Sequence, residues 1–135
     1  MITSLYAAIL ALYFIGLSVN VIRARRKLHV PLMDEGNEVM KRAIRVHGNF
    51  AEYAPLFLIM LGLAEKNGLP WYALHSLGCL FLLGRLLHSC GLLKAEQYSS
   101  NGLSGGKFRA RGMACTFTGI GFLALVLLVQ YLYFI

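Results

Sequence analysis

The sequence predicts an all-α protein, a four-helix bundle that spans a membrane. Of its 135 residues, 58% are hydrophobic and only 14% are charged, and the mean hydropathy is +0.63. An ordinary soluble domain is close to half apolar and about a quarter charged, so this chain is too apolar for one. Its apolar residues also form runs long enough to cross a bilayer, which takes about 20 residues of helix. In lipid such runs must be helices rather than open strands, because a helix pairs its backbone groups within one segment.

The first and last apolar runs are the clearest membrane spans. Residues 2–22 contain no charged side chain, and the run from Met113 to the end of the chain is equally uncharged. The first run could be mistaken for a secretory signal, but its start is uncharged and the basic cluster "RARRK" follows it. We therefore expect an uncleaved first span over residues 2–22 and a last span over residues 111–135.

The two middle spans contain polar side chains. Residues 71–93 are apolar apart from His75, Arg85, His88 and a few small polar residues. Upstream, the uncharged block Tyr53–Ala64 is too short to span alone, so a crossing helix must extend over residues 43–64. An interfacial or re-entrant segment is the alternative. We favour a span, because four helices with short connections make a compact bundle within a single domain of residues 1–135.

Basic residues lie on alternate connections. Seven of the 13 Lys and Arg fall between Arg23 and Arg45, and four more lie in or beside the third connection. By the positive-inside rule both connections are cytoplasmic, and both termini lie on the non-cytoplasmic side. The formal net charge of +7 could suggest nucleic acid, but the cations lie at the membrane boundary without interleaved aromatics. Membrane lipids or an anionic ligand are the expected partners, with no nucleic acid.

Polar residues on the second and third helices form the candidate site. Those of the second helix share one face about 100° wide: Arg45, Asn49, Glu52 and Tyr53. The third helix adds Arg85 and His88, three residues apart. A charge at the centre of a span costs at least about 2.5–3.5 kcal/mol, so these side chains should turn inward, pair or line a wet cavity. Either arginine could simply pair with Glu52. One carboxylate for two arginines leaves an excess of positive charge, however, as expected at a site for an anion.

Other catalytic signatures are not found in the sequence. The histidines and the three cysteines have no metal-ligand spacing, so no metal site is expected. There is no nucleophile elbow, Walker loop or dinucleotide fingerprint. His47 is either part of the polar face or an interfacial side chain, and His75 is expected to be a packing residue.

The chain resembles the membrane-associated proteins in eicosanoid and glutathione metabolism over nearly all of its length. The most specific match is "RVHGNFAEYAPLFLIMLGLAE" at the second helix, followed by "GRLLHSCG" on the third and "FRARGMACT" at the start of the fourth. The segment "RARR" also resembles the basic cluster of the leukotriene-forming member.

The resemblance implies a homotrimer that binds glutathione, as co-substrate or cofactor, between adjacent subunits near the cytoplasmic face. Members conjugate glutathione to lipophilic electrophiles, or reduce or isomerise lipid hydroperoxides. A glutathione transferase with possible peroxidase activity in a bacterial inner membrane is therefore expected. By resemblance the glutathione contacts are Arg25, Arg45, Asn49, Glu52, Tyr53, Arg85 and His88. The catalytic residues are Arg109, with Arg111 as a close competitor, and Arg26.

Two departures bear on activity. Leu92 stands where several glutathione-using members have a tyrosine, and Ala110 follows Arg109 where one member has a serine. A non-catalytic lipid- or glutathione-binding scaffold is therefore the alternative. A small drug exporter is a third hypothesis. Such exporters carry their key glutamate on the first helix, however, whereas Glu52 is on the second.

Overall fold

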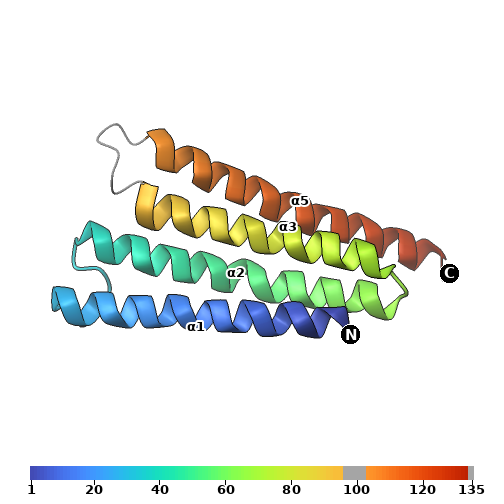
Figure 1. Ribbon diagram of the computed structural model, residues 1–135, viewed down its shortest axis with the longest axis horizontal. Coiled ribbons are helices and arrows are strands. Elements are labelled where there is room, and N and C mark those ends of the chain that lie inside the picture. The colour runs from blue at the N-terminus through green and yellow to red at the C-terminus, as the bar shows by residue number, and fades with distance from the viewer. Residues whose placement is uncertain (96–102, 134–135) are drawn as a thin grey trace.

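The computed structural model describes residues 1–95 and 103–133. Within them lie four long helices, α1 (Ile2–Leu28), α2 (Glu38–Lys66), α3 (Trp71–Cys90) and α5 (Leu103–Tyr133), and a short π-helix, η1 (Gly91–Ala95), that continues α3. Successive helices run in opposite directions, so both ends of the described chain lie at the same end of the bundle (Figure 1). The predicted all-α four-helix architecture is confirmed.

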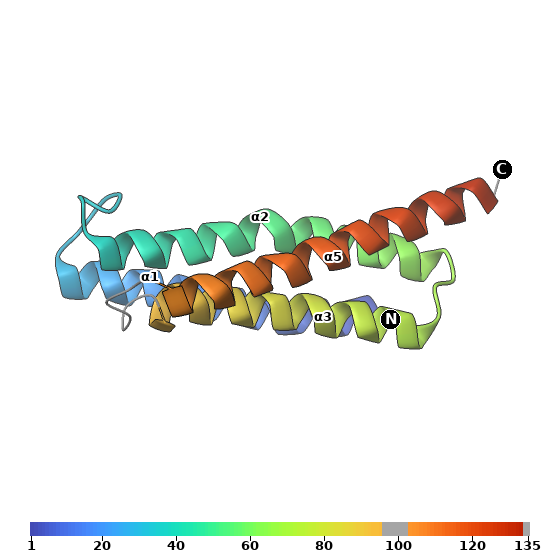
Figure 2. The same ribbon diagram turned by 90° about the horizontal axis from the view of Figure 1, so that it is seen from above.

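Three helices are long and apolar enough to cross a membrane, namely α1, residues Trp71–Leu93 and residues Gly106–Tyr133. The fourth, α2, is less apolar because its first half carries the polar face. At 29 residues it is about 43 Å long, enough to cross the hydrocarbon and both interfaces. It runs beside its neighbours along the bundle, as Figures 1 and 2 show, and does not turn back as a re-entrant segment would.

Three helices extend beyond the predicted spans, and one of them is α2, which covers Glu38–Lys66 against a predicted span of residues 43–64. Helix α1 continues past residue 22 to Leu28, because the basic residues Arg25, Arg26 and Lys27 are good helix formers and favour the negative end of the helix dipole. The polar stretch "SSNGLSGG", residues 99–106, predicts a loop before the last helix, but helix α5 begins at Leu103, so this prediction is wrong for residues 103–106. A glycine costs a helix only about 1 kcal/mol, which is too little to end it here. The rest of that predicted loop, residues 99–102, lies outside the described part of the chain.

The sequence "EKNGLP" predicts a tight turn in which Gly68 ends the second helix and Pro70 starts the third, and the connection between α2 and α3 has this form. The N–H of Gly68 donates to the carbonyl of Glu65, and the N–H of Leu69 donates to that of Ala64, which is the Schellman pattern. Gly68 has φ of 86°, a value that favours glycine, and Pro70 directly precedes α3. Glycine as the helix stop and proline as the restart are therefore confirmed.

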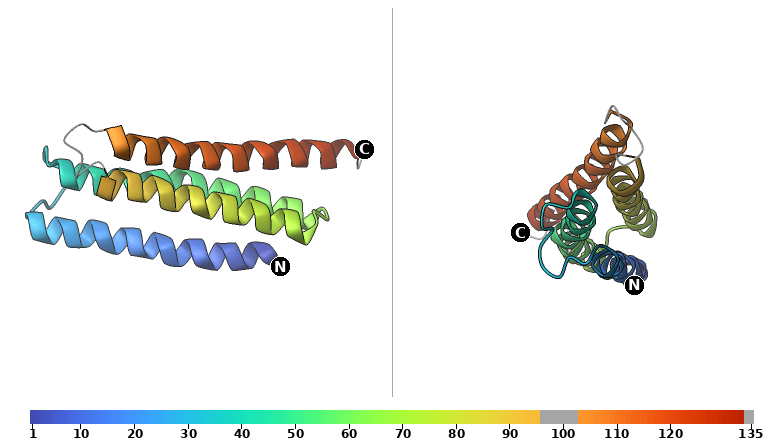
Figure 3. Two further views of the ribbon diagram at one scale, coloured as in Figure 1. Left: turned by 45° about the horizontal axis from the view of Figure 1, so that its top comes forward. Right: turned by 90° about the vertical axis from the view of Figure 1, so that its left-hand side faces the viewer.

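The helices pack as two pairs, α1 with α2 and α3 with α5. In the described chain, α2 also contacts α3 and α5, and α3 also contacts α1. Within these described residues, helices α1 and α5 do not contact each other. The end-on view in Figure 3 shows α1 and α5 on opposite sides of the bundle. At its centre the rings of Phe57 and Phe81 stack 4.0 Å apart, and both side chains are fully buried.

Helices α3 and α5 approach each other closely at two glycines. A Cβ built on Gly112 would lie 2.6 Å from the carbonyl oxygen of Gly84, and one on Gly84 would lie 2.9 Å from the carbonyl oxygen of Gly112. Neither position has room for a side chain. This contact fixes the position of α5 against α3 and therefore positions the residues at the start of α5.

Candidate functional site

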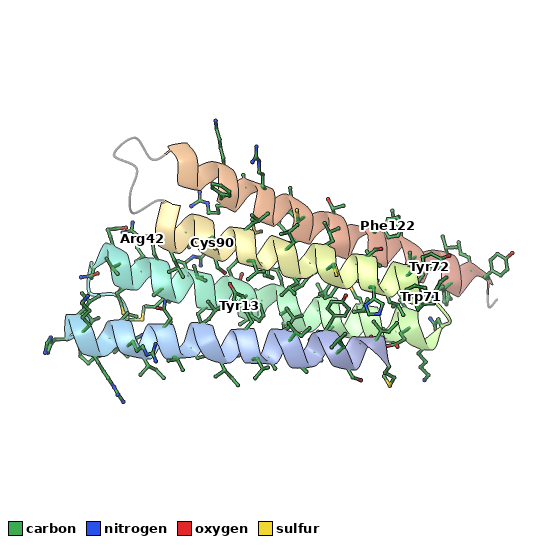
Figure 4. All side chains as sticks on the ribbon, in the orientation of Figure 1. Tyr13, Arg42, Trp71, Tyr72, Cys90 and Phe122 are labelled. Atoms are coloured by element: carbon green, nitrogen blue, oxygen red, sulfur yellow. The ribbon has the colours of Figure 1, made fainter. Side chains whose placement is uncertain are left out.

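A groove of about 370 Å³ opens between α2, α5 and the junction of α3 with η1. It lies at the end of the bundle opposite the two described chain ends, where Figure 4 labels Arg42 on α2. Nine side chains from the described residues line this basic groove: Glu38, Lys41, Arg42, Arg45, Asn49, His88, Leu92, Arg109 and Met113.

Helix α2 supplies more than half of this lining because its polar residues recur at helical spacing. Positions 38, 41, 42, 45 and 49 fall three or four residues apart and so follow one face of the helix. Glu38 forms a 3.5 Å ion pair with Lys41, both side chains being exposed. Four cations and one carboxylate therefore line the basic groove, which leaves it strongly positive.

Arg85 lies beneath the groove and is almost completely buried, with 1% of its surface exposed. Its guanidinium donates to Oδ1 of Asn49 across 2.7 Å, to the hydroxyl of Thr116, and weakly to Sδ of Met113 at 3.5 Å. The rings of Tyr53 and Phe81 lie 5.5 and 5.7 Å from the guanidinium carbon. Asn49 and Met113 contact Arg85 and also line the groove, so they link the buried charge to the open site.

No carboxylate contacts Arg85 among the described residues, and its buried Nε has no hydrogen-bond partner there. Taking an ion out of water costs several kcal/mol unless an opposite charge and full hydrogen bonding compensate it. Asn49, Thr116 and the aromatic faces compensate only in part. The guanidinium thus adds uncompensated positive charge at the base of a groove that is already cationic.

His88 is positioned by the close contact of α3 with α5. It is 6% exposed, and a Cβ on Gly112 would lie 2.5 Å from its backbone nitrogen. Helix α5 therefore rests on the backbone of α3 and brings Arg109 and Met113 to the same groove as His88. Arg111 is exposed and does not line the groove, so within one protomer Arg109 is the better placed of the two arginines.

Three residues expected at the site lie elsewhere in the single protomer. Arg25 donates to the carbonyls of Met33 (3.1 Å) and Val30 (3.4 Å) in the first connection. Arg26 is exposed on α1, and Glu52 is exposed on the outer side of α2. In the described chain the one ion pair is Lys41–Glu38. Neither Arg45 nor Arg85 therefore pairs with Glu52. That neighbouring subunits bring these three residues to the groove stays a prediction.

His47 and His75 have packing roles. The hydroxyl of Ser18 donates to the carbonyl of Phe14, so it must accept from Nε2 of His47, 3.0 Å away. The imidazole also stacks on Phe14 with 4.6 Å between ring centroids, which places His47 against α1 and not in the groove. His75 contacts the hydroxyl of Tyr6 through Nδ1 at 3.2 Å, as expected for a packing residue.

Lys41 and Met113 of the lining, and Gly112 and Thr116 next to it, were not predicted as site residues from the sequence. Thr116 accepts from Arg85 and donates to the carbonyl of Gly112 (2.9 Å), and Gly112 lets α5 approach α3. Gly112 and Thr116 both lie in "FRARGMACT", a segment in which only the arginines were predicted to have a role. Their four-residue spacing on the buried face of an apolar helix was the signal available.

Comparison with known proteins identifies the family. The MAPEG family matches residues 3–129. The chain is 36% identical to the inner membrane protein YecN of Escherichia coli strain K12 over 91 residues, 67% of this chain and 70% of YecN. It is also 36% identical to the uncharacterized protein sll1147 of Synechocystis sp. over 95 residues, 70% of this chain and 69% of that protein. With three helices long and apolar enough to span, the chain is an integral membrane protein, and it belongs to the MAPEG family.

Proposed function

We propose that the protein is a membrane-bound, glutathione-dependent transferase or peroxidase that acts on lipophilic electrophiles or hydroperoxides. The observation that carries the proposal is the basic groove: among the described residues, four cations and one carboxylate line it, above a buried arginine that no described carboxylate contacts. Such a site is built for a small molecule with more than one negative charge. The match of YecN, named as an inner membrane protein, supports a bacterial inner membrane as the location.

The donor set of the groove fits glutathione, which has two carboxylates, one ammonium group and one thiol. The guanidinium forks of Arg42 and Arg45 suit carboxylates, because they can donate two parallel hydrogen bonds. Asn49 and Glu38 offer oxygen acceptors for the ammonium group. A volume of about 370 Å³ is at the lower end of the range of about 300–1,000 Å³ for small-molecule sites, so a tripeptide would fill the groove.

When bound, glutathione supplies a thiol whose thiolate is the nucleophile. A free thiol has a pKa of about 8.5 and is mostly protonated near neutral pH. Arg109 is positioned at the groove to favour the negative charge, and a nearby guanidinium in a site shielded from water lowers a thiol pKa. Arg26 keeps its proposed catalytic role only if another subunit brings it to the groove, as the expected homotrimer would require.

A non-catalytic scaffold that binds lipid or glutathione is the second candidate, and one observation favours it. Leu92 and Met113 form the apolar part of the groove, and in the described part of the chain no tyrosine lines it. Thiolate stabilisation would therefore depend on guanidinium groups alone. The ultraviolet absorbance of a thiolate in the glutathione complex separates the two candidates, because a scaffold has no reason to ionise the thiol.

Calorimetry with glutathione on the full chain in detergent tests the proposal. Arg45→Ala should weaken binding about tenfold or more, since a charge-assisted hydrogen bond contributes about 1.5–3 kcal/mol. Lys107→Ala is the matched control, because Lys107 is an exposed cation of α5 outside the groove. Conjugation to a generic aryl halide and reduction of a lipid hydroperoxide then test catalysis. Equal binding by the two variants would reject the groove as the glutathione site.

A further inference from the structure

A second, mainly apolar groove of about 370 Å³ lies between α1 and α3. It is on the other side of α3 from the basic groove: His88 and Leu92 face the basic groove, whereas Ser89 and Leu93 face this one. This lipid groove is lined chiefly by Leu12, Tyr13 and Gly16 of α1, by Leu86 and Ser89 of α3 and by Leu93 of η1. Tyr13 and Cys90, which also lines it, are labelled in Figure 4 in the half of the bundle that carries the basic helix ends.

The lipid groove has an open apolar interior. A Cβ built on Gly16 would meet no atom within 4 Å, so the space beside this residue is empty. The hydroxyl of Ser89 donates to the carbonyl of Arg85 at 2.8 Å, which satisfies its one donor within α3. A groove of this kind, formed by two membrane-spanning helices, suits a hydrocarbon chain rather than a polar molecule.

The face of α1 that lines this groove carries two cations further along the helix. Arg23 and Lys27 follow Leu12 by 11 and 15 residues, which places them within about 60° of Leu12 around the helix axis. Both are exposed, and in the described chain neither forms an ion pair. Arg25 lies on the opposite face and donates to carbonyls of the first connection, so it is not part of this face.

The distances along α1 match those of a lipid molecule. At a rise of 1.5 Å per residue, Arg23 and Lys27 lie about 16 and 22 Å from Leu12 along the axis. Half of the bilayer is about 15 Å of hydrocarbon plus about 5–7 Å of headgroup region. With Leu12 near the bilayer centre, the two cations are at the level of the headgroups. We infer that this face binds an anionic phospholipid, with an acyl chain in the groove and the phosphate between Arg23 and Lys27.

This inference is independent of the proposed glutathione site, because α3 separates the two grooves. It also explains why the groove and the cations share one face of α1, which neither helix packing nor the positive-inside rule requires. A cation near a membrane surface contributes about 1 kcal/mol toward an anionic lipid, or about fivefold in affinity, so the pair should contribute about thirtyfold.

Native mass spectrometry of the full chain in non-ionic detergent, titrated with phosphatidylglycerol or phosphatidylcholine, tests the inference. We expect phosphatidylglycerol to be retained and phosphatidylcholine to be lost at the same concentration. The double variant Arg23→Gln, Lys27→Gln should lose affinity for phosphatidylglycerol about thirtyfold. Gly16→Leu, which fills open space without a clash, should also displace the lipid. Lys66→Gln, an exposed cation at the opposite end of the bundle, is the matched control and should behave as wild type.

Three outcomes would overturn the inference. Equal retention of the two lipids would show that the charge on the lipid is not recognised. Retention of phosphatidylglycerol by the double variant or by Gly16→Leu at the wild-type level would show that it binds elsewhere. A change in oligomeric mass on Gly16→Leu without loss of lipid would assign the groove to a second copy of the chain. Calorimetry with glutathione on the same variants should give wild-type affinity, which keeps this test separate from that of the basic groove.

Discussion

The guanidinium of Arg85, from α3, donates to the side-chain carbonyl of Asn49, from α2, across 2.7 Å. A neutral amide thus accepts from a buried cation at a position where a carboxylate would pair with it. The arrangement holds the two helices together and leaves the positive charge of Arg85 uncompensated beside the basic groove. This relationship connects the packing of the bundle to its proposed affinity for an anion.

Asn49→Asp tests that relationship directly. The new carboxylate would lie beside Arg85 and neutralise it, so we expect the affinity for glutathione to fall about tenfold or more without loss of thermal stability. Calorimetry and a thermal melt on the same sample measure the two effects. Asn49→Leu is the control for loss of the hydrogen bond alone, and should lower the free energy of unfolding by about 1.5–3 kcal/mol. Undiminished binding by Asn49→Asp would contradict a role for the charge of Arg85.

Thr116→Val should destabilise the protein by about 1–3 kcal/mol. Its hydroxyl is fully buried and accepts from Arg85, so valine leaves a buried donor of the guanidinium without a partner. Thr118→Val makes the same chemical change on the exposed side of α5 and should stay within about 0.5 kcal/mol. Denaturant titration followed by circular dichroism measures both values. Similar losses in the two variants would show that the hydroxyl contact with Arg85 contributes little.

Gly112→Ala should separate α5 from α3. The added Cβ would meet the carbonyl oxygen of Gly84 at 2.6 Å, and overpacking of this kind costs about 1–3 kcal/mol. Because α5 carries Arg109, glutathione affinity should fall together with the melting temperature. At Gly121 a Cβ meets nothing within 4 Å, so Gly121→Ala should be neutral or slightly stabilising. Equal melting temperatures for Gly112→Ala and Gly121→Ala would contradict the close packing of α5 against α3 at Gly112.

The stability of the end of the bundle that carries the chain termini should depend on pH through Glu65. This carboxylate, just outside the predicted span 43–64, accepts from the backbone N–H groups of Ile2 and Thr3 at the start of α1. The hydroxyl and N–H of Thr3, followed by the N–H of Ile2, hold the pKa of Glu65 below its ordinary value of 4.5.

A lowered pKa in the folded state means that Glu65 stabilises the fold at pH values above 4.5. This stabilisation is lost as the pH falls through the lower pKa of the folded state. We expect the melting temperature to decrease over that range in the wild type and to change less in Glu65→Gln. Glu35→Gln, in the exposed first connection, is the control and should keep the wild-type pH profile. A wild-type profile in Glu65→Gln would contradict this contribution.

The sequence determined the helices, because local composition is enough to decide them. A run of about 20 apolar residues in lipid has to pair its own backbone groups, and the helix is the single-segment solution. The turn at Gly68 and Pro70 follows from the same kind of local chemistry. The helical period placed Arg45, Asn49, Glu52 and Tyr53 on one face of α2, of which Arg45 and Asn49 line the groove and Glu52 does not. The motif at that helix was enough to identify the family.

Only the tertiary structure decided which polar side chains meet. Hydropathy and period fix the faces of a helix but not its rotation and depth against its neighbours, so they could not show that Arg85 contacts Asn49 and Thr116 and not Glu52. They also could not show that Arg25 would bind loop carbonyls instead of the groove. Gly84 and Gly112 allow α5 to approach α3 closely because neither has a side chain. The electrostatics of the basic groove thus depends on packing that no single segment of the sequence contains.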